Sequence, residues 1–441
     1  MCKNNRQIIL GFSGLLILSL SVLFYLPLWK YYSDSSATYL FFRDNYFFYE
    51  LLTLGLLLAV GIYWWLDRKL IKNPPRLSII LISLAILSLI LLAVFPIGAS
   101  DIFLYLTQAR TFAFHGLSPY VATYSQLTND IFYPFLKDNR WANYTSSYGP
   151  FFTLITGGLA RIFKSDLLAT ILLFKGFFAA CHLANTWLVD KTLGRRFAWL
   201  YAFNPLILFE FLINGHNEVL MIFFCLLSFY FLWQKTPSLK NSLFSIFFLT
   251  LGILIKFIPL LLLPVWGLAL LWRLKDRVKK ILFIGLSIPL IIGTGFLAYL
   301  PFGLGSAVLL KPIMAQMHFF NCLLTSPAVT FIYNLLAISK IANPWGLAIL
   351  ISRGLFVCFL LFIATKIIRG WREKNVKKLL NYGALIILAF DVSFFSWLMP
   401  WYFTFLLLLL LISHSLNNRK GYLITFYATT VIGLTYYLIL R

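Results

Sequence analysis

Acidic side chains are the groups in this sequence whose type and position point most directly to chemistry. The chain has only 14 Asp and Glu among 441 residues, and a charge near the centre of a membrane is costly. Asp101 directly follows the apolar run 77–97, which is long enough to cross a bilayer. Its carboxylate is therefore expected at a membrane boundary, where it could act as a base. The alternative is a favourable charge in the first turn of a helix capped by Ser100.

Residues 101–116 have the pattern of a helix with one polar side. At 100° per residue, four polar side chains fall on one face, with apolar residues opposite: Asp101, Tyr105, Gln108 and His115. This pattern predicts a helix lying on the membrane with its polar side toward water. A polar segment follows and ends at Tyr148-Gly149-Pro150. Long ordered loops of this kind usually carry function.

Two more polar groups interrupt the apolar sequence downstream. Residues 214–218 gather amides with His216 and Glu218, a composition that suits a sugar or phosphate site and equally suits a polar turn. Lys256 separates two short apolar segments, so its ammonium could neutralise a lipid phosphate or simply reach the head groups. Lys175 lies within an apolar run and needs an anion or a wet cavity. Asp391 and Glu210 are its possible partners.

The last third of the chain offers fewer chemical groups. Residues 301–345 are expected to form a second large outer loop, with Gln316 and His318 as candidate substrate contacts. Trp401 is expected first as an anchor at the membrane interface and second as a platform for stacking on a sugar. The five cysteines are scattered without metal or redox spacing. No nucleotide-binding fingerprint occurs, so nucleotide chemistry is unsupported.

Composition predicts an all-α polytopic membrane protein, because 61% of residues are hydrophobic and only 12% are charged. The predicted transmembrane segments number thirteen: 8–28, 47–66, 77–97, 167–189, 197–213, 218–233, 242–255, 257–272, 281–300, 346–367, 379–396, 400–415 and 421–439. The first is interpreted as a retained helix, since no small-residue cleavage site follows it. The net charge of +23 resides mainly in short connectors and reports topology rather than nucleic-acid binding.

The basic connectors also predict which side each loop faces. With a cytosolic amino terminus they lie in the cytosol, which leaves residues 98–166 and 301–345 as the two large outer loops. This assignment of loops to alternate sides holds only if segment 150–163 is a surface helix that does not cross the membrane. It also brings Asp101, the 214–218 turn and Lys256 to the same outer side.

Several motifs together resemble a known family. The strings SDIFLYLTQAR…HGLSPY, YGP, GRRFAWLYAFNP…NGHNEVLM and GILIKFIPLLLLP resemble the GT-C membrane glycosyltransferases that use polyprenyl-phosphate sugars. The likeness is greatest to the bacterial α-1,6-mannosyltransferases of lipid-linked mannan synthesis. It covers residues 77–300 by motif and the whole chain by hydropathy. One departure is Asn217-Glu218, where relatives often have Asn-Asp.

The resemblance implies a GT-C-like bundle of about 13 transmembrane helices, with surface helices in the first outer loop. Its expected parts are two amino-terminal helices (1–76), a catalytic core (77–300) and the second outer loop with the carboxy-terminal helices (301–441). It also implies an inverting transferase with Asp101 as the base. The other expected substrate-binding residues are Tyr105, Gln108, His115, Tyr148, His216, Asn217, Glu218, Lys256, Gln316, His318 and Trp401. Among these, Tyr105 and Gln108 would contact sugar or acceptor, His216 and Glu218 would position it, and Lys256 would contact the phosphate.

The expected partners are a polyprenyl-phosphate sugar, a lipid-linked or glycan acceptor and membrane lipid, with no nucleic acid. Monophosphate users resemble metal-independent enzymes, so neither a metal nor a cofactor is expected. The resemblance implies a bacterial plasma membrane with the site on the extracytoplasmic side, and mannose as the sugar. Two alternatives stay open: a flippase or transporter for lipid-linked glycan, and an O-antigen type ligase or polymerase. Charged residues spread along an inner channel would favour the first, whereas this chain gathers its unusual polar groups on one side. Essential Arg and His in the late loop would favour the second, whereas residues 301–345 contain no Arg.

Overall fold

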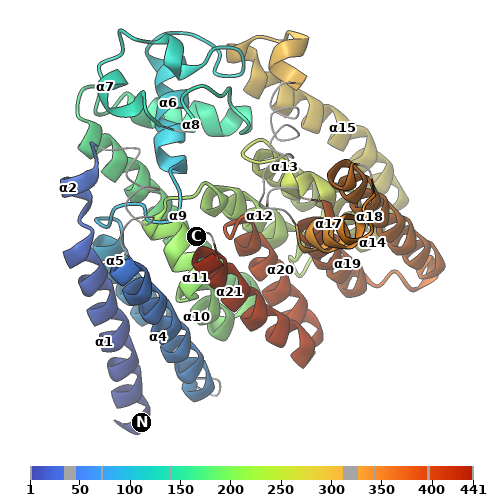
Figure 1. The fold of residues 1–441 in the computed structure, drawn as a ribbon. Helices are drawn as coiled ribbons and strands as arrows, with labels where there is room; N and C mark the ends of the chain where they lie inside the picture. The colour runs from blue at the N-terminus through green and yellow to red at the C-terminus, as the bar shows by residue number, and fades with distance from the viewer. Residues whose placement is uncertain are drawn as a thin grey trace.

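The chain folds as a bundle of helices that carries a cap at one end (Figure 1). The computed structural model describes residues 2–33, 46–70, 73–139, 141–310, 326–341, 343–394 and 398–439. No β-strand occurs within these ranges. The predicted all-α class is therefore confirmed.

The amino-terminal helices support the start of the cap. They are α1 (Cys2–Tyr25), α2 (Leu28–Tyr31), α4 (Tyr46–Leu70) and α5 (Leu77–Leu91). The turn after α1 is bonded to the end of α5, because Leu28 N donates to Ala93 O (2.7 Å) and Phe95 N donates to Leu26 O (2.9 Å). These bonds fix the direction in which the chain leaves α5 toward Asp101.

The central helices form the most buried part of the bundle. They are α9 (Leu167–Leu193), α10 (Arg195–Ala202), α11 (Pro205–Leu208), the π-helix η2 (Phe209–Ile213), α12 (Glu218–Leu232), α13 (Leu239–Ile253), η3 (Ile258–Leu262) and α14 (Leu263–Arg273). The helical path breaks at Lys256, as the sequence predicts. Lys175 donates to the backbone oxygen of Val94. The partner of Lys175 is therefore a backbone carbonyl at the end of α5, and neither of the two possible partners, Asp391 and Glu210, binds the ammonium.

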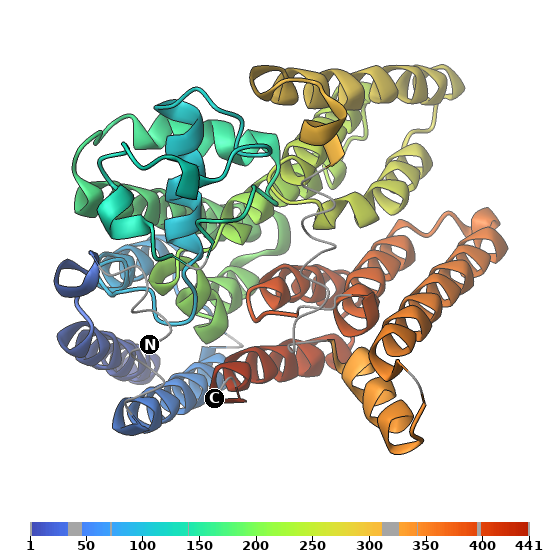
Figure 2. The same ribbon diagram turned by 45° about the horizontal axis from the view of Figure 1, so that its top comes forward.

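The carboxy-terminal helices are more exposed, except where they return to the core. They are α15 (Arg277–Tyr299), η4 (Leu300–Phe302), α17 (Pro327–Ile338), α18 (Pro344–Arg369), η6 (Trp371–Glu373), α19 (Val376–Ala389), the π-helix η7 (Phe390–Phe394), α20 (Tyr402–Asn417) and α21 (Lys420–Ile439). Figure 2 shows α17 and α18 at the margin of the molecule and α20 inside it. The apolar face of α15 is largely uncovered, as expected for a helix surrounded by lipid.

Within the part of the chain that the structure describes, three helices are individually long and apolar enough to cross a membrane: Leu167–Leu193, Arg277–Phe302 and Pro344–Arg369. The pair Arg195–Ala202 and Pro205–Ile213 qualifies together as one span bent by 53°. Shorter apolar helices of 10–17 residues include Leu77–Leu91, Glu218–Leu232 and Tyr402–Asn417. Each of the thirteen predicted segments contains helix within the described residues, whereas the crossing of all thirteen stays a prediction.

The cap comprises α6 (Asp101–Ala113), η1 (Tyr124–Gln126), α7 (Tyr133–Leu136) and α8 (Pro150–Ala160), which Figures 1 and 2 show gathered over α9. The prediction that α6 keeps a polar side exposed to water is wrong, because residues 101–111 are all buried. Helices α8 and α9 pack against α6, and the loop that carries Asp130 folds over it. Because its polar residues find partners in these elements, the helix can be covered on both sides.

Candidate active site

Asp101 begins α6 and is the central carboxylate of a buried polar cluster. Only 7% of the residue is exposed, and Tyr148 Oη donates a hydrogen bond to Oδ1 at 2.7 Å. Burial raises the pKa of Asp101 above its usual value, while the Tyr148 hydrogen bond and the charge of Lys256 act in the opposite direction. A carboxylate with a raised pKa and few donors is well suited to accept a proton.

Two tyrosines link α6 to neighbouring elements. The rings of Tyr105 and Tyr148 meet edge to face with centroids 5.1 Å apart, and Phe152 of α8 packs against both. The hydroxyl of Tyr105 accepts a hydrogen bond from Asn217 N at 3.3 Å. Tyr105 therefore fixes the 214–218 turn relative to Asp101.

Gln108 lies one turn further along α6 and binds the end of the loop. Ser146 Oγ donates to Gln108 Oε1 at 2.9 Å, and Ser146 N donates to Pro119 O at 2.7 Å. The amide nitrogen Nε2 of Gln108 is buried without a hydrogen-bond partner in the described part of the chain. The sequence did not indicate Ser146, because one serine within a polar loop carries no pattern.

The π-helix η2 and the turn after it bring the second group of polar residues to the site. Asn214 Oδ1 accepts hydrogen bonds from Gly98 N (2.9 Å) and Ile97 N (3.2 Å), while its Nδ2 donates to Glu210 (3.0 Å). Gly215 adopts φ +73°, a conformation that glycine tolerates best. The turn is therefore tied by side-chain bonds to the chain segment that leads into α6.

His216 and Trp401 form a stacked pair at the border of the cluster. Their ring centroids lie 4.1 Å apart, and His216 Nε2 lies 3.3 Å from Glu210 Oε2. Burial, together with the nearby charge of Lys256, lowers the pKa of His216 well below its usual value. A neutral imidazole held in this way can position a ligand without adding a charge.

Lys256 completes the cluster by binding Glu218 directly. Its ammonium forms an ion pair with Glu218 Oε1 and lies 4.4 Å from the ring centroid of Tyr402 and 5.8 Å from that of Tyr148. Lysine carries three donors, so this ion pair leaves donors for a further anion. Tyr402 was not among the expected site residues, because its position beside Trp401 was interpreted as part of an aromatic anchor.

A backbone clamp holds Lys256 next to the end of the first loop. Gly149 N donates to Ile255 O at 3.0 Å, and Phe151 N donates to Leu254 O at 3.1 Å. A Cβ atom at position 149 would lie 2.0 Å from Leu254 O. Only glycine permits this approach, which sets Tyr148 and Lys256 side by side.

The structure gathers most of the expected residues in this one cluster: Asp101, Tyr105, Gln108, Tyr148, His216, Asn217, Glu218, Lys256 and Trp401. The placement predicted for His115 is wrong. Helix α6 ends at Ala113 and Gly116 turns the chain, so His115 instead binds Asp130 at 2.7 Å. Gln316 and His318 lie outside the described residues.

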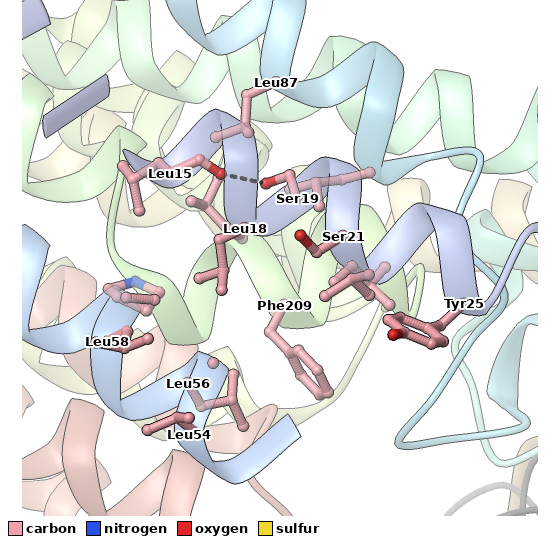
Figure 3. A pocket seen from close by; sticks show the side chains of 17 residues that line it. Leu15, Leu18, Ser19, Ser21, Tyr25, Leu54, Leu56, Leu58, Leu87 and Phe209 are labelled. Carbon is pink, nitrogen blue, oxygen red and sulfur yellow. Dashed lines mark hydrogen bonds between the residues drawn. The ribbon is translucent and has the colours of Figure 1, made fainter. Parts of the chain in front are cut away.

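A separate cavity of about 340 Å³ lies between α1, α4, α5 and the segment α11–η2 (Figure 3). Its wall is apolar apart from hydroxyls such as that of Ser19, which bonds to Leu15 O within its own helix. Phe209 and Ile213 of η2 contribute to the wall, whereas Glu210 of the same π-helix bonds to Asn214. The cavity is therefore distinct from the polar cluster.

Comparison with known protein families supplies the identity that this geometry leaves open. Residues 9–272 match the family described as alpha-(1->6)-mannopyranosyltransferase, N-terminal domain. The chain belongs to this family. Membership confirms the resemblance inferred from the motifs and identifies a membrane glycosyltransferase of the mannosyltransferase class. No curated protein and no solved structure matched the chain.

The mannopyranosyltransferase match includes α6, the 214–218 turn and Lys256, but not Trp401 or Tyr402. The matched region therefore holds every carboxylate and cation of the polar cluster described above. This membership favours the glycosyltransferase over the flippase and over the O-antigen type ligase or polymerase.

Proposed function

We propose that the chain transfers mannose from a polyprenyl-phosphate donor to a lipid-linked or glycan acceptor, with inversion at the anomeric carbon. The observation that carries this proposal is the buried Asp101 carboxylate, to which Tyr148 is the one side-chain donor among the described residues, in a cluster that also contains Lys256. The cluster combines a proton acceptor with a cation, which are the two groups that this reaction needs. Family membership supports the mannosyl part of the proposal.

Asp101 is proposed as the general base. Its carboxylate takes the proton of an acceptor hydroxyl as the oxygen attacks the anomeric carbon, and the bond from that carbon to the phosphate oxygen breaks. The polyprenyl phosphate leaves with the bonding electrons. A single displacement requires one base and inverts the configuration. Tyr148 orients the carboxylate through its hydrogen bond.

Lys256 is proposed to neutralise the donor phosphate. Glu218 holds the ammonium in position through one donor, and the remaining donors are available to phosphate oxygens. Polar atoms without partners among the described residues then suit the hydroxyls of the sugar. They are Gln108 Nε2 and both side-chain polar atoms of Asn217. A buried amide lacking a protein partner is costly, and a bound polyol would satisfy it.

The proposed topology puts this reaction on the extracytoplasmic side, with thirteen spans and residues 77–300 as the catalytic core. The basic connectors support this orientation, since positive charges favour the cytosolic side. A sugar attached to a long isoprenoid stays in the membrane. A transferase whose polar cluster lies beside apolar helices can therefore reach it there.

A transfer assay in proteoliposomes tests the proposal. It compares wild type with Asp101→Asn, using labelled polyprenyl-phosphate mannose and a glycan acceptor. Loss of the base is expected to lower the transfer rate roughly 10²- to 10⁴-fold, and NMR of the wild-type product is expected to show the inverted anomer. Asp138→Asn is the matched control, since Asp138 is an exposed acid in the same loop. Undiminished transfer by Asp101→Asn would overturn the assignment of the base.

A further inference from the structure

Two consecutive aromatic residues at the start of α20 contact the polar cluster from outside the region that matches the family. The ring of Trp401 stacks on His216 with centroids 4.1 Å apart, and the ring centroid of Tyr402 lies 4.4 Å from the Lys256 ammonium. The matched region ends at residue 272. The carboxy-terminal helices therefore supply one side of the cluster.

The turn that carries these rings is fixed by hydrogen bonds and by packing. Tyr402 N donates to Met399 O at 3.1 Å, and Thr404 Oγ1 donates to Trp401 O at 2.6 Å. Helix α20 packs against α12, which begins at Glu218. The two rings are thus held beside the helix whose first residue is the anion of the buried ion pair.

The ammonium of Lys256 stands at the end of a flexible four-carbon stem and needs contacts to hold one orientation. Glu218 Oε1 binds it on one side, and the Tyr402 ring lies over it, with Tyr148 further away at 5.8 Å. An aromatic face attracts a cation most strongly where water is excluded, and Lys256 is only 3% exposed. Together, the carboxylate and the ring restrict the directions in which the remaining N–H groups of the ammonium can point.

We propose that Tyr402 is a positioning residue of this site, whose ring holds the Lys256 ammonium so that its remaining N–H groups point toward the phosphate of the sugar donor. The inference rests on the proposed function. The ring carries this role rather than the hydroxyl, because the face of the ring makes the contact. The phosphate side of the site is then completed by a helix outside the matched region.

Variants at position 402 test the proposal in the proteoliposome assay. Tyr402→Phe keeps the ring, whereas Tyr402→Leu and Tyr402→Met remove it. We expect both ring-free variants to raise the KM for the sugar donor about tenfold, since a desolvated contact between a cation and an aromatic ring is lost. Competitive inhibition by polyprenyl phosphate, which carries the phosphate without the sugar, should weaken by about the same factor. Tyr402→Phe should retain the wild-type values, and none of the three variants should change the KM for the acceptor.

A double-mutant cycle with Lys256→Gln distinguishes positioning of the ammonium from packing. Glutamine removes the charge and keeps a hydrogen-bond donor for Glu218. If the ring acts through the ammonium, Tyr402→Leu should raise the KM for the sugar donor in the wild-type background and leave it unchanged in the Lys256→Gln background. A ring that only packs would give the same rise in both backgrounds, and that result would overturn the proposal. A wild-type KM in the ring-free variants, or a Tyr402→Phe variant as impaired as they are, would overturn it as well.

Tyr382→Leu is the matched control for loss of a half-buried tyrosine. Tyr382 lies in α19 and lines a small pocket with Trp272 and Glu373. Its loss is expected to lower the unfolding temperature and leave both KM values unchanged. Failure of the proposed function would appear differently, as full transfer by Asp101→Asn.

Discussion

A buried aspartate lies at each end of α6, and the two aspartates differ in their hydrogen-bond donors. Asp130 packs against the carboxy-terminal end and accepts hydrogen bonds from Arg110 Nε at 2.6 and 2.8 Å, Tyr124 Oη at 2.9 Å and Phe132 N at 2.9 Å. The ring of His115 lies 2.7 Å from its other oxygen. Asp101, at the opposite end, has one side-chain donor in the described part of the chain, Tyr148. Both residues are buried, so burial alone does not distinguish them.

The difference in donors appears in the pKa values. Burial acts to raise the pKa of Asp130, but hydrogen bonds from Arg110 and His115 outweigh it and lower the pKa below its usual value. For Asp101, burial dominates and the pKa is raised. A carboxylate surrounded by donors is held ionised and inert, whereas one with a single donor can take a proton. The Asp130 end is therefore suited to holding the cap together, and the Asp101 end to chemistry.

Gly149→Ala is the change expected to disturb the Asp101 end most. A Cβ atom there would overlap the carbonyl oxygen of Leu254 at 2.0 Å, so the backbone clamp must open. Tyr148 and Lys256 would then move away from Asp101. Misplacement by about 1 Å can lower a rate roughly 10²-fold. Steady-state transfer by the reconstituted variant measures this effect.

Gly158→Ala is the matched control for that clamp. Gly158 lies in α8, and no atom lies within 4 Å of a Cβ built at this position. Alanine is a better helix former than glycine, so we expect full activity and equal or slightly higher stability. Full activity in Gly149→Ala would show that the clamp does not position the site.

Asp130→Asn is expected to destabilise the cap without changing the rate of the transfer reaction. The substitution leaves the Arg110 guanidinium buried without its anion, which typically lowers the free energy of unfolding by about 3 kcal/mol. Thermal unfolding in detergent measures the loss, and transfer per folded molecule is expected to stay near the wild-type value. Because the folded pKa of Asp130 is lowered, its stabilisation is present above the usual Asp range and disappears as the pH falls through that pKa. The variant and wild type should therefore converge in stability at acid pH, whereas a constant difference would contradict this role.

Tyr148→Phe is expected to change the pH dependence of transfer. The base must be ionised, so kcat/KM falls as the pH drops through the pKa of Asp101, which is already raised. The Tyr148 hydrogen bond lowers that pKa, and its removal is expected to move the acid limb to a higher pH. At pH values above this limb we expect kcat/KM to be about tenfold lower than in wild type, as for the loss of one hydrogen bond to a charged group. An unchanged limb would indicate that another group titrates.

The sequence was sufficient to predict the helical class and much of the site, because the site residues stand out chemically. Asp101, Glu218 and Lys256 are rare charges at the ends of apolar segments. The order of these segments along the chain was enough to predict that the three residues lie on the same side of the membrane. The partnership of Lys256 with Glu218 was not predictable, since a pairing between distant helices leaves no local pattern. Tyr402 was visible only as part of an aromatic anchor, since its contact with Lys256 likewise leaves no local pattern.

The error at α6 has a physical cause. Helical periodicity assigned one polar face to water, but a loop of the same chain supplied buried partners for Arg110 and Gln108. Periodicity also assumes that the helix continues. It ends at Ala113, so the angle calculated for His115 had no meaning. Tertiary contacts of a loop decided the burial of the helix, and these are not encoded in the spacing of one helix.

His115→Gln is expected to have the smallest effect of these changes and tests the corrected placement. The His115 side chain is 25% exposed and supplies one of several donors to Asp130, so its loss is expected to cost under about 1 kcal/mol of stability. Glutamine retains a donor that can reach the same carboxylate. The KM values for donor and acceptor should not change, since His115 lies at the end of α6 remote from Asp101. A raised KM would mean that His115 reaches the substrate. The assignment of a structural role to the Asp130 end of α6 and a chemical role to the Asp101 end would then be wrong.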